Sequence, residues 1–489
     1  MASVYLPRLA EEEYGVATAL ASAVNYGLDA WWAKVDARNA ARPVDDSPYD
    51  PVVHLKELWL GCELHQALTL NQERPAWMKA QMAYAFWCLF SGPSATYEIV
   101  PFIDSYKWRE AVKGVYSLRV QSALLPISLD QEMKLPVYGT FFVKANGTGE
   151  HVLVTVDFAY DIPYCVVNVM ANPHGSDGAA ERFLASLAQS LVANDIYHRK
   201  CLSFHKGYLE FAAVTMTSWG GIILKPRIKD AIRQNTVSVL KHMDSLASLN
   251  LCPNRNTLLI SPPGMAKTSV FRAISHELED QMTRIWCTGK SIEYAEHVTA
   301  LFAAARSLAP CILFIEDMDL FGRDRASALT PSHVLNEFLA CLDGAQENFG
   351  VVVVASTNDF SCMDEALVNR PGRFDVKIEI PFPDDGERHA MLASFFDSYK
   401  AAPDPSVTPE IWKNVIALTE GFTGAYMRDV AKSTVIRAVD AGMFDGDCAT
   451  FTADHLVASA EQSHKNFQLG QKAKKHQVTV DAQLQYPES

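Results

Sequence analysis

Apolar residues follow three different patterns along the chain, and each pattern predicts a different kind of structure. Up to about residue 95 they recur at helical spacing, over 11–35, 54–70 and 75–90. From about 96 to 213, short apolar runs alternate with turn residues, which is typical of strands. Beyond 219, apolar runs of strand length alternate with amphipathic segments, which predicts a parallel sheet with helices on both faces.

The middle pattern predicts an α+β domain. Strands are expected over 97–103, 118–125, 135–144, 151–158, 164–170 and 201–211, and a helix over 177–193 is expected to cover one face. The sequence Asn-Gly-Thr-Gly at 146–149 separates two of these runs and predicts a hairpin turn. No catalytic set of residues is visible before residue 215, so this half does not indicate what it recognises.

Composition narrows the class of protein without deciding its function. The chain has 489 residues, enough for two or three domains, and its 43 basic and 57 acidic residues give a net charge of −14. This acidic balance makes nucleic acid a less favoured partner. The ten cysteines are scattered without a Cys-x-x-Cys pair, and neither a signal peptide nor a membrane span is evident. We therefore expect a cytoplasmic protein without a membrane span.

The stretch 256–268 predicts a phosphate-binding loop. An apolar run is followed by a Pro- and Gly-containing turn and then by Lys267 and Thr268, which open an amphipathic segment. In a strand–loop–helix of this kind, backbone N–H groups and the helix N-terminus wrap phosphates, the lysine adds charge and the hydroxyl binds magnesium. The loop departs from the usual G-x-x-x-x-G-K-[ST] pattern, because Ser261 and Ala266 occupy the two glycine positions.

Polar residues follow the next two buried runs of the same region. Glu316 and Asp317 follow the run 311–315, and Asn358 follows 351–355. At the carboxyl ends of parallel strands, one carboxylate can hold magnesium, the next can orient and deprotonate water, and the amide can position that water. Arg370 and Arg373, held in Arg-Pro-Gly-Arg, are suited to reach a phosphate in this subunit or in a neighbour.

In this order and spacing the motifs resemble the AAA family, a ring-forming branch of the P-loop ATPases. The resemblance covers about 219–439 and includes Leu-Asn-Glu-Phe at 335–338, Leu-Asp-Gly at 342–344, Ser-Thr-Asn at 356–358, Asp-Glu-Ala-Leu at 364–367, Arg-Pro-Gly-Arg-Phe-Asp at 370–375 and Gly-Phe-Thr-Gly-Ala at 421–425. The Glu-Asp order at 316–317 inverts the family's Asp-Glu and is similar to the branch that contains a mitochondrial translocase of a folded iron–sulfur protein.

The resemblance implies a role for each of these residues. Lys267 and Thr268 would bind the phosphates and the Mg²⁺ of ATP, and Glu316 would also associate with Mg²⁺. Asp317 would be the catalytic carboxylate and Asn358 the first sensor of the γ-phosphate, while Arg370 and Arg373 would act on the ATP of a neighbouring subunit. The other residues expected to contact the nucleotide are Pro263, Gly264, Met265, Ala266, Ser269, Gly424 and Ala425.

The resemblance also completes the predicted organisation. Residues 1–95 would be a helical region, 96–218 an α+β recognition or assembly domain, 219–385 the large α/β subdomain with the P-loop core, 386–460 a small helical lid and 461–489 a polar flexible tail. The segment 289–294 looks too short for the loop with which unfoldases of the family thread a chain. Tyr294 is a candidate pore residue there, although packing on a helix face is the preferred interpretation.

Three functions fit this organisation. The first is a homo-oligomeric ring, of six subunits by resemblance, that couples ATP hydrolysis to remodelling of a protein substrate. The second is a nucleotide-gated scaffold with little hydrolysis, because the altered loop and the inverted acidic pair can slow turnover. The third is a nucleic-acid-handling motor, which rests on the basic cluster at 472–476 and on the breadth of the family.

Overall fold

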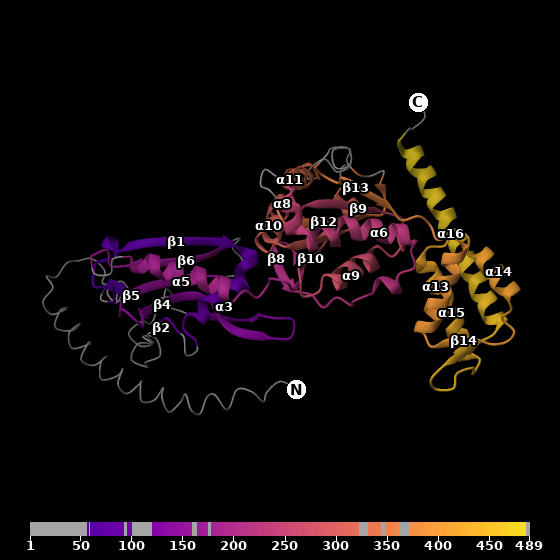
Figure 1. Ribbon diagram of the computed structural model, residues 1–489, viewed down its shortest axis with the longest axis horizontal. Coiled ribbons are helices and arrows are strands. Elements are labelled where there is room, and N and C mark those ends of the chain that lie inside the picture. The colour runs from indigo at the N-terminus through magenta and orange to yellow at the C-terminus, as the bar shows by residue number, and fades with distance from the viewer. Residues whose placement is uncertain are drawn as a thin grey trace. The chain divides into compact units, whose positions relative to one another are not determined.

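The computed structural model describes residues 56–57, 59–91, 95–99, 120–158, 164–174, 178–321, 331–343, 348–360, 363 and 372–485. Only the backbone is described at 320–321, 331–332 and 470–485. These residues form two large sheets and a set of helices, whose elements are labelled in Figure 1. The expected helix over 11–35 lies outside the described residues.

The first sheet is antiparallel and is covered by two helices. Its strands are β1 (Leu68–Pro75), β2 (Tyr97–Ile99), β3 (Gln121–Pro126), β4 (Glu132–Ala145), β5 (His151–Asp157) and β6 (Tyr164–Ala171). The order is β1-β6-β5-β4-β2, and β3 pairs with β4. Helices α3 (Lys79–Cys88) and α5 (Ala179–Ala193) are joined by a hydrogen bond from Gln81 Nε2 to the Leu191 carbonyl oxygen at 2.9 Å. The expected hairpin at 146–149 is confirmed, because β4 and β5 pair on either side of it.

The prediction of helices throughout 1–95 is wrong at residues 68–75. This segment is strand β1, and all eight of its residues pair with β6. Its sequence alternates Leu, Thr, Leu and Asn, a pattern of period two that suits a strand with one side against a sheet. The third predicted helix, over 75–90, is confirmed as α3.

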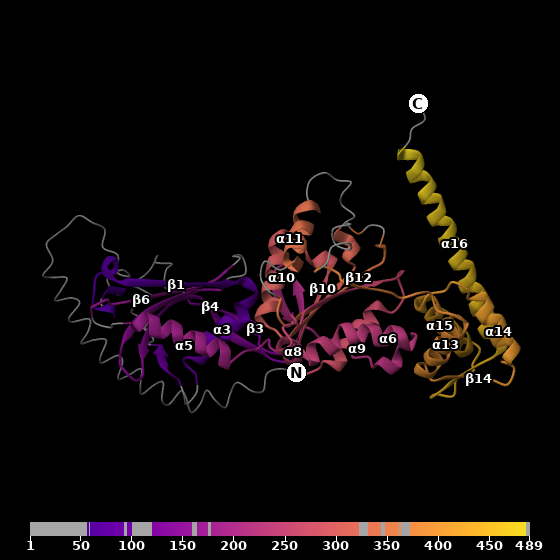
Figure 2. The same ribbon diagram turned by 45° about the horizontal axis from the view of Figure 1, so that its top comes forward.

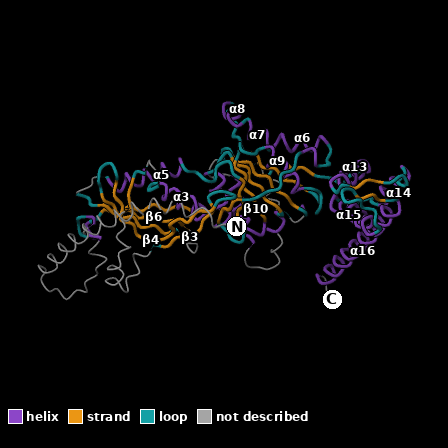
Figure 3. The backbone as a smooth tube through the Cα atoms, turned by 90° about the horizontal axis from the view of Figure 1, so that it is seen from below, coloured by secondary structure: helices purple, strands orange, loops and turns teal. Residues whose placement is uncertain are grey.

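The second sheet holds the predicted parallel core. Its strands are β7 (Cys201–His205), β8 (Tyr208–Phe211), β9 (Arg255–Ile260), β10 (Thr283–Thr288), β11 (Cys311–Glu316), β12 (Val351–Thr357) and β13 (Val376–Glu379), in the order β13-β9-β12-β11-β10-β7-β8. The strands β9 to β13 pair in parallel, as does β7 with β10. Residues 311–315 are buried throughout, as expected for a parallel strand covered on both faces. Figure 3 shows the strands of both sheets in orange.

Helices precede and alternate with the strands of this sheet along the chain. They are the 3₁₀ turn η4 (Trp219–Gly221), α6 (Pro226–Asn235), α7 (Val237–Lys241), α8 (Met243–Ser248), α9 (Lys267–Glu277), α10 (Ala295–Ser307) and α11 (Pro331–Asp343). Helix α9 starts directly at the lysine of the phosphate loop. The strand–loop–helix predicted over 256–281 is therefore confirmed.

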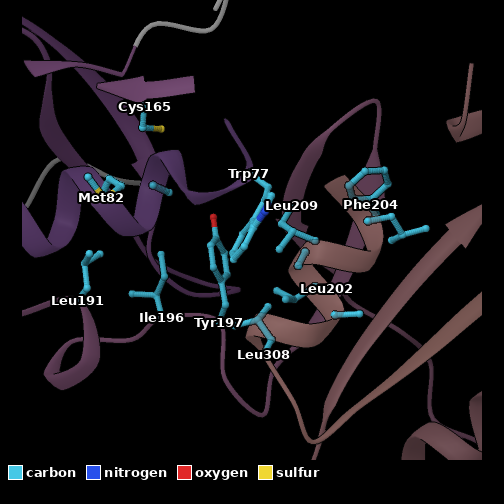
Figure 4. Close-up of a cluster of buried hydrophobic side chains, with 14 of the residues drawn as sticks. Trp77, Met82, Cys165, Leu191, Ile196, Tyr197, Leu202, Phe204, Leu209 and Leu308 are labelled. Atoms are coloured by element: carbon cyan, nitrogen blue, oxygen red, sulfur yellow. The ribbon is translucent and has the colours of Figure 1, made fainter. Parts of the chain in front are cut away.

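The hairpin β7–β8 differs from the expected arrangement. The sequence assigned 201–211 to the α+β domain, whereas in the structure β7 continues the second, mainly parallel sheet by pairing with β10. Leu202 and Phe204 are 0 % and 2 % exposed in the same hydrophobic cluster as Leu308, which Figure 4 shows. Strand pairing over 80 residues is a long-range choice that local pattern does not encode.

The C-terminal part is a bundle with its own core. It comprises α13 (Asp385–Ser398), β14 (Ala401–Pro403), α14 (Pro409–Leu418), α15 (Gly424–Asp440), β15 (Ala449–Phe451) and α16 (Ala453–Gln485). The Asp384 carboxylate and Glu387 form a capping box at the start of α13. Phe396, Phe422 and Phe451 are buried in the bundle core. The predicted helices are present here, and their role as a lid stays a prediction.

The prediction of a flexible tail over 461–489 is wrong as far as residue 485. Helix α16 continues through this stretch, as Figure 2 shows. Its first part belongs to the bundle, because Ser463 donates to Asp429 at 2.9 Å and Phe467 packs on Phe422. The stretch is rich in Gln and Lys, which favour helix, and its first proline is Pro487. In the described part of the chain, no helix is both apolar and long enough to cross a membrane.

Candidate active site

The phosphate loop spans the gap between β9 and α9. Lys267 is 8 % exposed, and its Nζ donates to the Ser261 carbonyl oxygen at 2.6 Å, to Ser261 Oγ at 3.0 Å and to the Pro262 carbonyl oxygen at 3.1 Å. Ser261 stands where a glycine is usual, and its hydroxyl supplies an acceptor that glycine lacks. Sequence reasoning treated this serine only as a departure from the pattern.

Asn358 connects the lysine to the acidic pair. Lys267 Nζ donates to Asn358 Oδ1 at 2.8 Å, and Asn358 Nδ2 donates to Asp317 Oδ1 at 2.7 Å. The amide can satisfy both neighbours in only one orientation, because lysine has no acceptor and the carboxylate no donor. Three residues that follow three separate strands therefore form one chain of hydrogen bonds, and the amide lies beside Asp317 as predicted.

Asp319, which was not among the predicted site residues, also contacts this arrangement. It is 2 % exposed, and its Oδ1 accepts from the backbone N–H of Asn358 at 3.2 Å. Burial lowers the pKa of the Lys267 ammonium to about 8, while Asp317, Asp319 and Glu316 oppose that shift. The signal that could have identified Asp319 is its place three residues after Glu316, in the same acidic run.

Glu316 and Thr268 present the groups that suit magnesium. Burial raises the pKa of the Glu316 carboxyl, and a hydrogen bond with the Thr268 side chain opposes the shift. Glu316 Oε1 is buried and has no hydrogen-bond partner. A hydroxyl beside a carboxylate with an unused oxygen is a hard oxygen donor set, so these residues fit Mg²⁺ bound together with phosphates.

Two loop residues have left-handed backbone conformations. Gly264 has φ +82°, and a Cβ there would lie 2.7 Å from the Ala425 Cβ. Its carbonyl oxygen accepts from the Ala425 backbone N–H at 3.1 Å, so the loop lies against the start of α15. Ala266 has φ +63° at the N-cap of α9, a region that alanine adopts at a cost.

Replacing Ala266 with glycine is expected to raise the free energy of unfolding by about 0.5 to 1 kcal/mol. Relief of left-handed strain is worth roughly 1 to 2 kcal/mol, and the greater entropy of glycine in the unfolded chain offsets part of it. Urea denaturation measures the change. Ala273→Gly, inside the same helix, is the matched control and should lower stability by about 1 kcal/mol. Equal losses for the two variants would contradict the strain at Ala266.

The loop opens into a cavity of about 460 Å³. One wall carries Glu316, Asp317 and Asn358 beside the loop, and the other carries Gly424 and Ala425 at the start of α15. All seven predicted loop residues line the cavity, namely Pro263, Gly264, Met265, Ala266, Lys267, Thr268 and Ser269. The remaining lining residues are Gly221, Ile222, Ile223, Ser356, Met391, Ser394, Phe395 and Arg428.

Arg428 is a lining residue that sequence reasoning missed. It lies one helical turn after Ala425 on α15, and its guanidinium carbon is 5.2 Å from the centre of the Phe395 ring. That spacing from the Gly-Ala motif was the available signal, because residues three apart share a helix face. With Lys267, it gives the cavity a cation on each of two walls.

Of the two predicted arginine fingers, the structure describes only Arg373. Arg370 lies outside the described residues. Arg373 is 4 % exposed, and its Nε and terminal nitrogen donate to the Asp343 carboxylate at 2.7 and 2.6 Å. It is absent from the lining of this chain's own cavity. The structure therefore pairs the buried Arg373 with the exposed Asp343 at the end of α11, and the action of Arg373 on a neighbour's ATP stays a prediction.

Tyr294 lies at the N-cap of α10 and is 58 % exposed. Its ring meets the edge of His297, with centroids 5.3 Å apart. Packing on a helix face, the preferred interpretation from sequence, therefore covers less than half of this side chain.

Comparison with known proteins supports the assignment of this region. Residues 257–382 match the model of the AAA family, the ATPase family associated with various cellular activities. The chain is 37 % identical over 220 residues to the ATP-dependent zinc metalloprotease FtsH 3 of Sorangium cellulosum, covering 42 % of this chain and 35 % of that protein. It is 31 % identical over 216 residues to human ATP-dependent zinc metalloprotease YME1L1, covering 42 % and 27 %.

A third similar protein is the proteasome-activating nucleotidase of Methanoculleus marisnigri, with 32 % identity over 232 residues, 45 % of this chain and 52 % of that protein. The matched part thus spans between about a quarter and half of these relatives.

Among the described residues, no group of three or more His, Cys, Asp or Glu side chains is placed to hold a metal ion.

Proposed function

We propose that this chain, whose residues 257–382 form an AAA ATPase domain, binds and hydrolyses ATP in a homo-oligomeric ring and uses the energy to remodel a protein substrate. The observation that carries the proposal is the hydrogen-bonded chain Lys267–Asn358–Asp317 beside Thr268 and Glu316. It brings a phosphate ligand, a sensor and a carboxylate to one wall of one cavity. The first sheet, with α3 and α5, would serve recognition or assembly.

The reaction is the attack of water on the γ-phosphorus of ATP. The water oxygen forms the new bond, the bond to the bridging oxygen breaks, and ADP leaves with the electron pair. The Asp317 carboxylate orients the water and accepts its proton, while Lys267 stabilises the charge on the phosphates. Bound Mg²⁺, which Thr268 and Glu316 would hold, neutralises phosphate charge.

Mixing two inactive variants tests the ring. Lys267→Ala lacks a working site of its own, and Arg370→Ala lacks the arginine that would act on a neighbour. Each variant alone should be inactive, and mixtures should recover turnover, because an intact site meets an intact arginine at some interfaces. Arg370 suits this test better than Arg373, since Arg373→Ala would also break the ion pair with Asp343.

Failure of every mixture to recover turnover, in samples that still assemble by light scattering, would contradict a shared site. A wild-type chain that binds ATP and assembles but does not turn over would favour the nucleotide-gated scaffold. Loss of the assembly on dilution without ATP would show whether the nucleotide holds the subunits together.

Affinity for ATP is expected to fall as pH rises through about 8. The pKa of Lys267 is lowered to about 8, so the free chain loses this proton above that pH and binding must restore it. If only the ammonium form binds, the dissociation constant rises roughly tenfold between about pH 7 and 9. Titration calorimetry measures it. Lys267→Arg should remove most of this dependence, because arginine keeps its charge; an unchanged slope would contradict Lys267 as its source.

A further inference from the structure

A carboxylate at the far end of α9 binds three side chains, one of which belongs to a segment that lines the cavity. Glu277 is the last residue of α9, and Lys267 is the first. The Glu277 side chain is 17 % exposed and accepts from Trp219 Nε1 at 2.8 Å, from Arg233 at 2.9 and 2.7 Å, and from Lys241 Nζ at 3.2 Å. The Arg233 hydrogen bonds hold the pKa of Glu277 at about 2, so it is charged throughout the physiological range.

Trp219 leads directly into the cavity wall. The residues two to four positions later, Gly221, Ile222 and Ile223, line the cavity. Ile222 is 3 % exposed and packs in the core of the sheet, whereas Ile223 packs against the core of the lid. Lys229 Nζ also donates to the Trp219 carbonyl oxygen at 2.7 Å, so the residue is held by its side chain and by its backbone.

The cavity has two chemically different ends. The phosphate loop, Glu316 and Asp317 provide charged groups and backbone N–H groups, which suit phosphates. The rest of the lining includes Gly221–Ile223 with Met391 and Phe395, whose apolar surfaces suit a base, and Arg428, whose guanidinium lies over the Phe395 ring. A nucleotide with its phosphates on the loop has its nucleoside at this apolar end.

We propose that Glu277, acting through Trp219, is a positioning residue that sets the Gly221–Ile223 wall at the distance from the phosphate loop that a nucleoside requires. Helix α9 has 11 residues, about 16 Å of rigid spacer, and one end carries the loop while the other holds the wall. The proposal rests on the proposed function, since it assumes that this cavity takes a nucleotide. According to this proposal, the contacts of Glu277, about 15 Å along the helix from Lys267, affect affinity for the nucleoside but not for the phosphates.

The test compares two ligands, Mg²⁺-adenylyl imidodiphosphate and Mg²⁺-tripolyphosphate, by calorimetry on the full chain. Tripolyphosphate has no nucleoside, so it reports the phosphate loop alone. Trp219→Phe removes the indole N–H and keeps an aromatic ring, and Glu277→Gln removes the charge. Each should weaken the nucleotide analogue about tenfold, the effect of losing a hydrogen bond to a charged group, and leave tripolyphosphate within about twofold.

Two further variants sharpen the test. Glu279→Gln, at an exposed position two residues past Glu277, is the matched control and should bind both ligands like wild type. In the double variant of Trp219→Phe and Glu277→Gln, the loss should be smaller than the product of the single losses, because both changes remove the same contact. Lys229→Met tests the same wall from the backbone side if Trp219→Phe does not fold.

Equal weakening of both ligands, or unchanged binding of the analogue in folded Trp219→Phe and Lys229→Met, would overturn the positioning role. Wild-type chain that binds tripolyphosphate but not the analogue would overturn it as well. If wild type binds neither ligand, the proposed function itself fails, and that outcome is distinct from the others.

Discussion

Alanine at position 267 is expected to weaken ATP binding by at least about 30-fold. Lys267 is the cation nearest the loop, and truncating one partner of a buried, hydrogen-bonded charge pair costs about 2 to 5 kcal/mol, where 1.4 kcal/mol is tenfold in affinity. Its four acceptors in the loop and on Asn358 would also lose their donor. Calorimetric titration with the non-hydrolysable analogue measures the loss.

The fold should survive this change. Burial makes the charged ammonium unfavourable in the folded chain, as the lowered pKa of Lys267 shows, so its removal relieves a desolvation cost. The melting temperature is therefore expected to stay close to that of wild type. The control is Lys290→Ala. Lys290 is exposed in the turn that follows β10 of the same sheet, so this variant should bind the analogue like wild type. Affinity of Lys267→Ala within tenfold of wild type would remove this lysine from the site.

Asparagine at position 317 is expected to keep ATP binding and to lower turnover by about 10² to 10⁴, the range for loss of a general base. The amide oxygen can still accept from Asn358 Nδ2, so the arrangement of the wall persists. What is lost is the negative charge that orients the water and the capacity to take its proton. Steady-state phosphate release at saturating ATP, with binding measured separately, shows the separation.

A matched substitution tests whether a change in backbone conformation, and not the loss of charge, lowers the turnover of Asp317→Asn. Asp317 has φ +53°, and asparagine tolerates this left-handed region well. Asp280 has φ +60° and is exposed, so Asp280→Asn repeats the same chemical change away from the cavity and should turn over like wild type. Turnover of Asp317→Asn within threefold of wild type would assign the base to another residue.

Much of the site was predictable because its residues lie in local patterns. The step from an apolar strand through a Gly-containing loop to Lys267 is contiguous, and so is the buried run that ends in Glu316 and Asp317. Parallel strands bring such ends to one edge, which predicted that Asn358 would join them. The helices of the lid were predicted as a region, and the capping residue Asp384 marks its start.

Other predictions from the sequence were wrong because the structure of those segments depends on contacts with residues distant in sequence. Residues 68–75 were predicted to be helical in part, and their pairing with β6 made them a strand. The segment after 461 reads as polar tail, and contacts of Ser463 and Phe467 with the bundle hold its first turns in α16. Local sequence was compatible with the observed element in each case but did not require it, and tertiary contacts decided the result.

By itself the sequence determined the chemistry of this protein: a phosphate loop, two carboxylates and an amide. Each of them follows a strand whose run of apolar residues indicates that the strand is buried. The tertiary structure decided the contacts among them. It placed Asn358 between Lys267 and Asp317, paired Arg373 with Asp343, added β7–β8 to the sheet and joined Trp219 to Glu277. The sequence states the type of each side chain and its place in a local pattern, whereas its hydrogen-bond partner depends on which distant groups the sheet register and helix packing bring within about 3 Å.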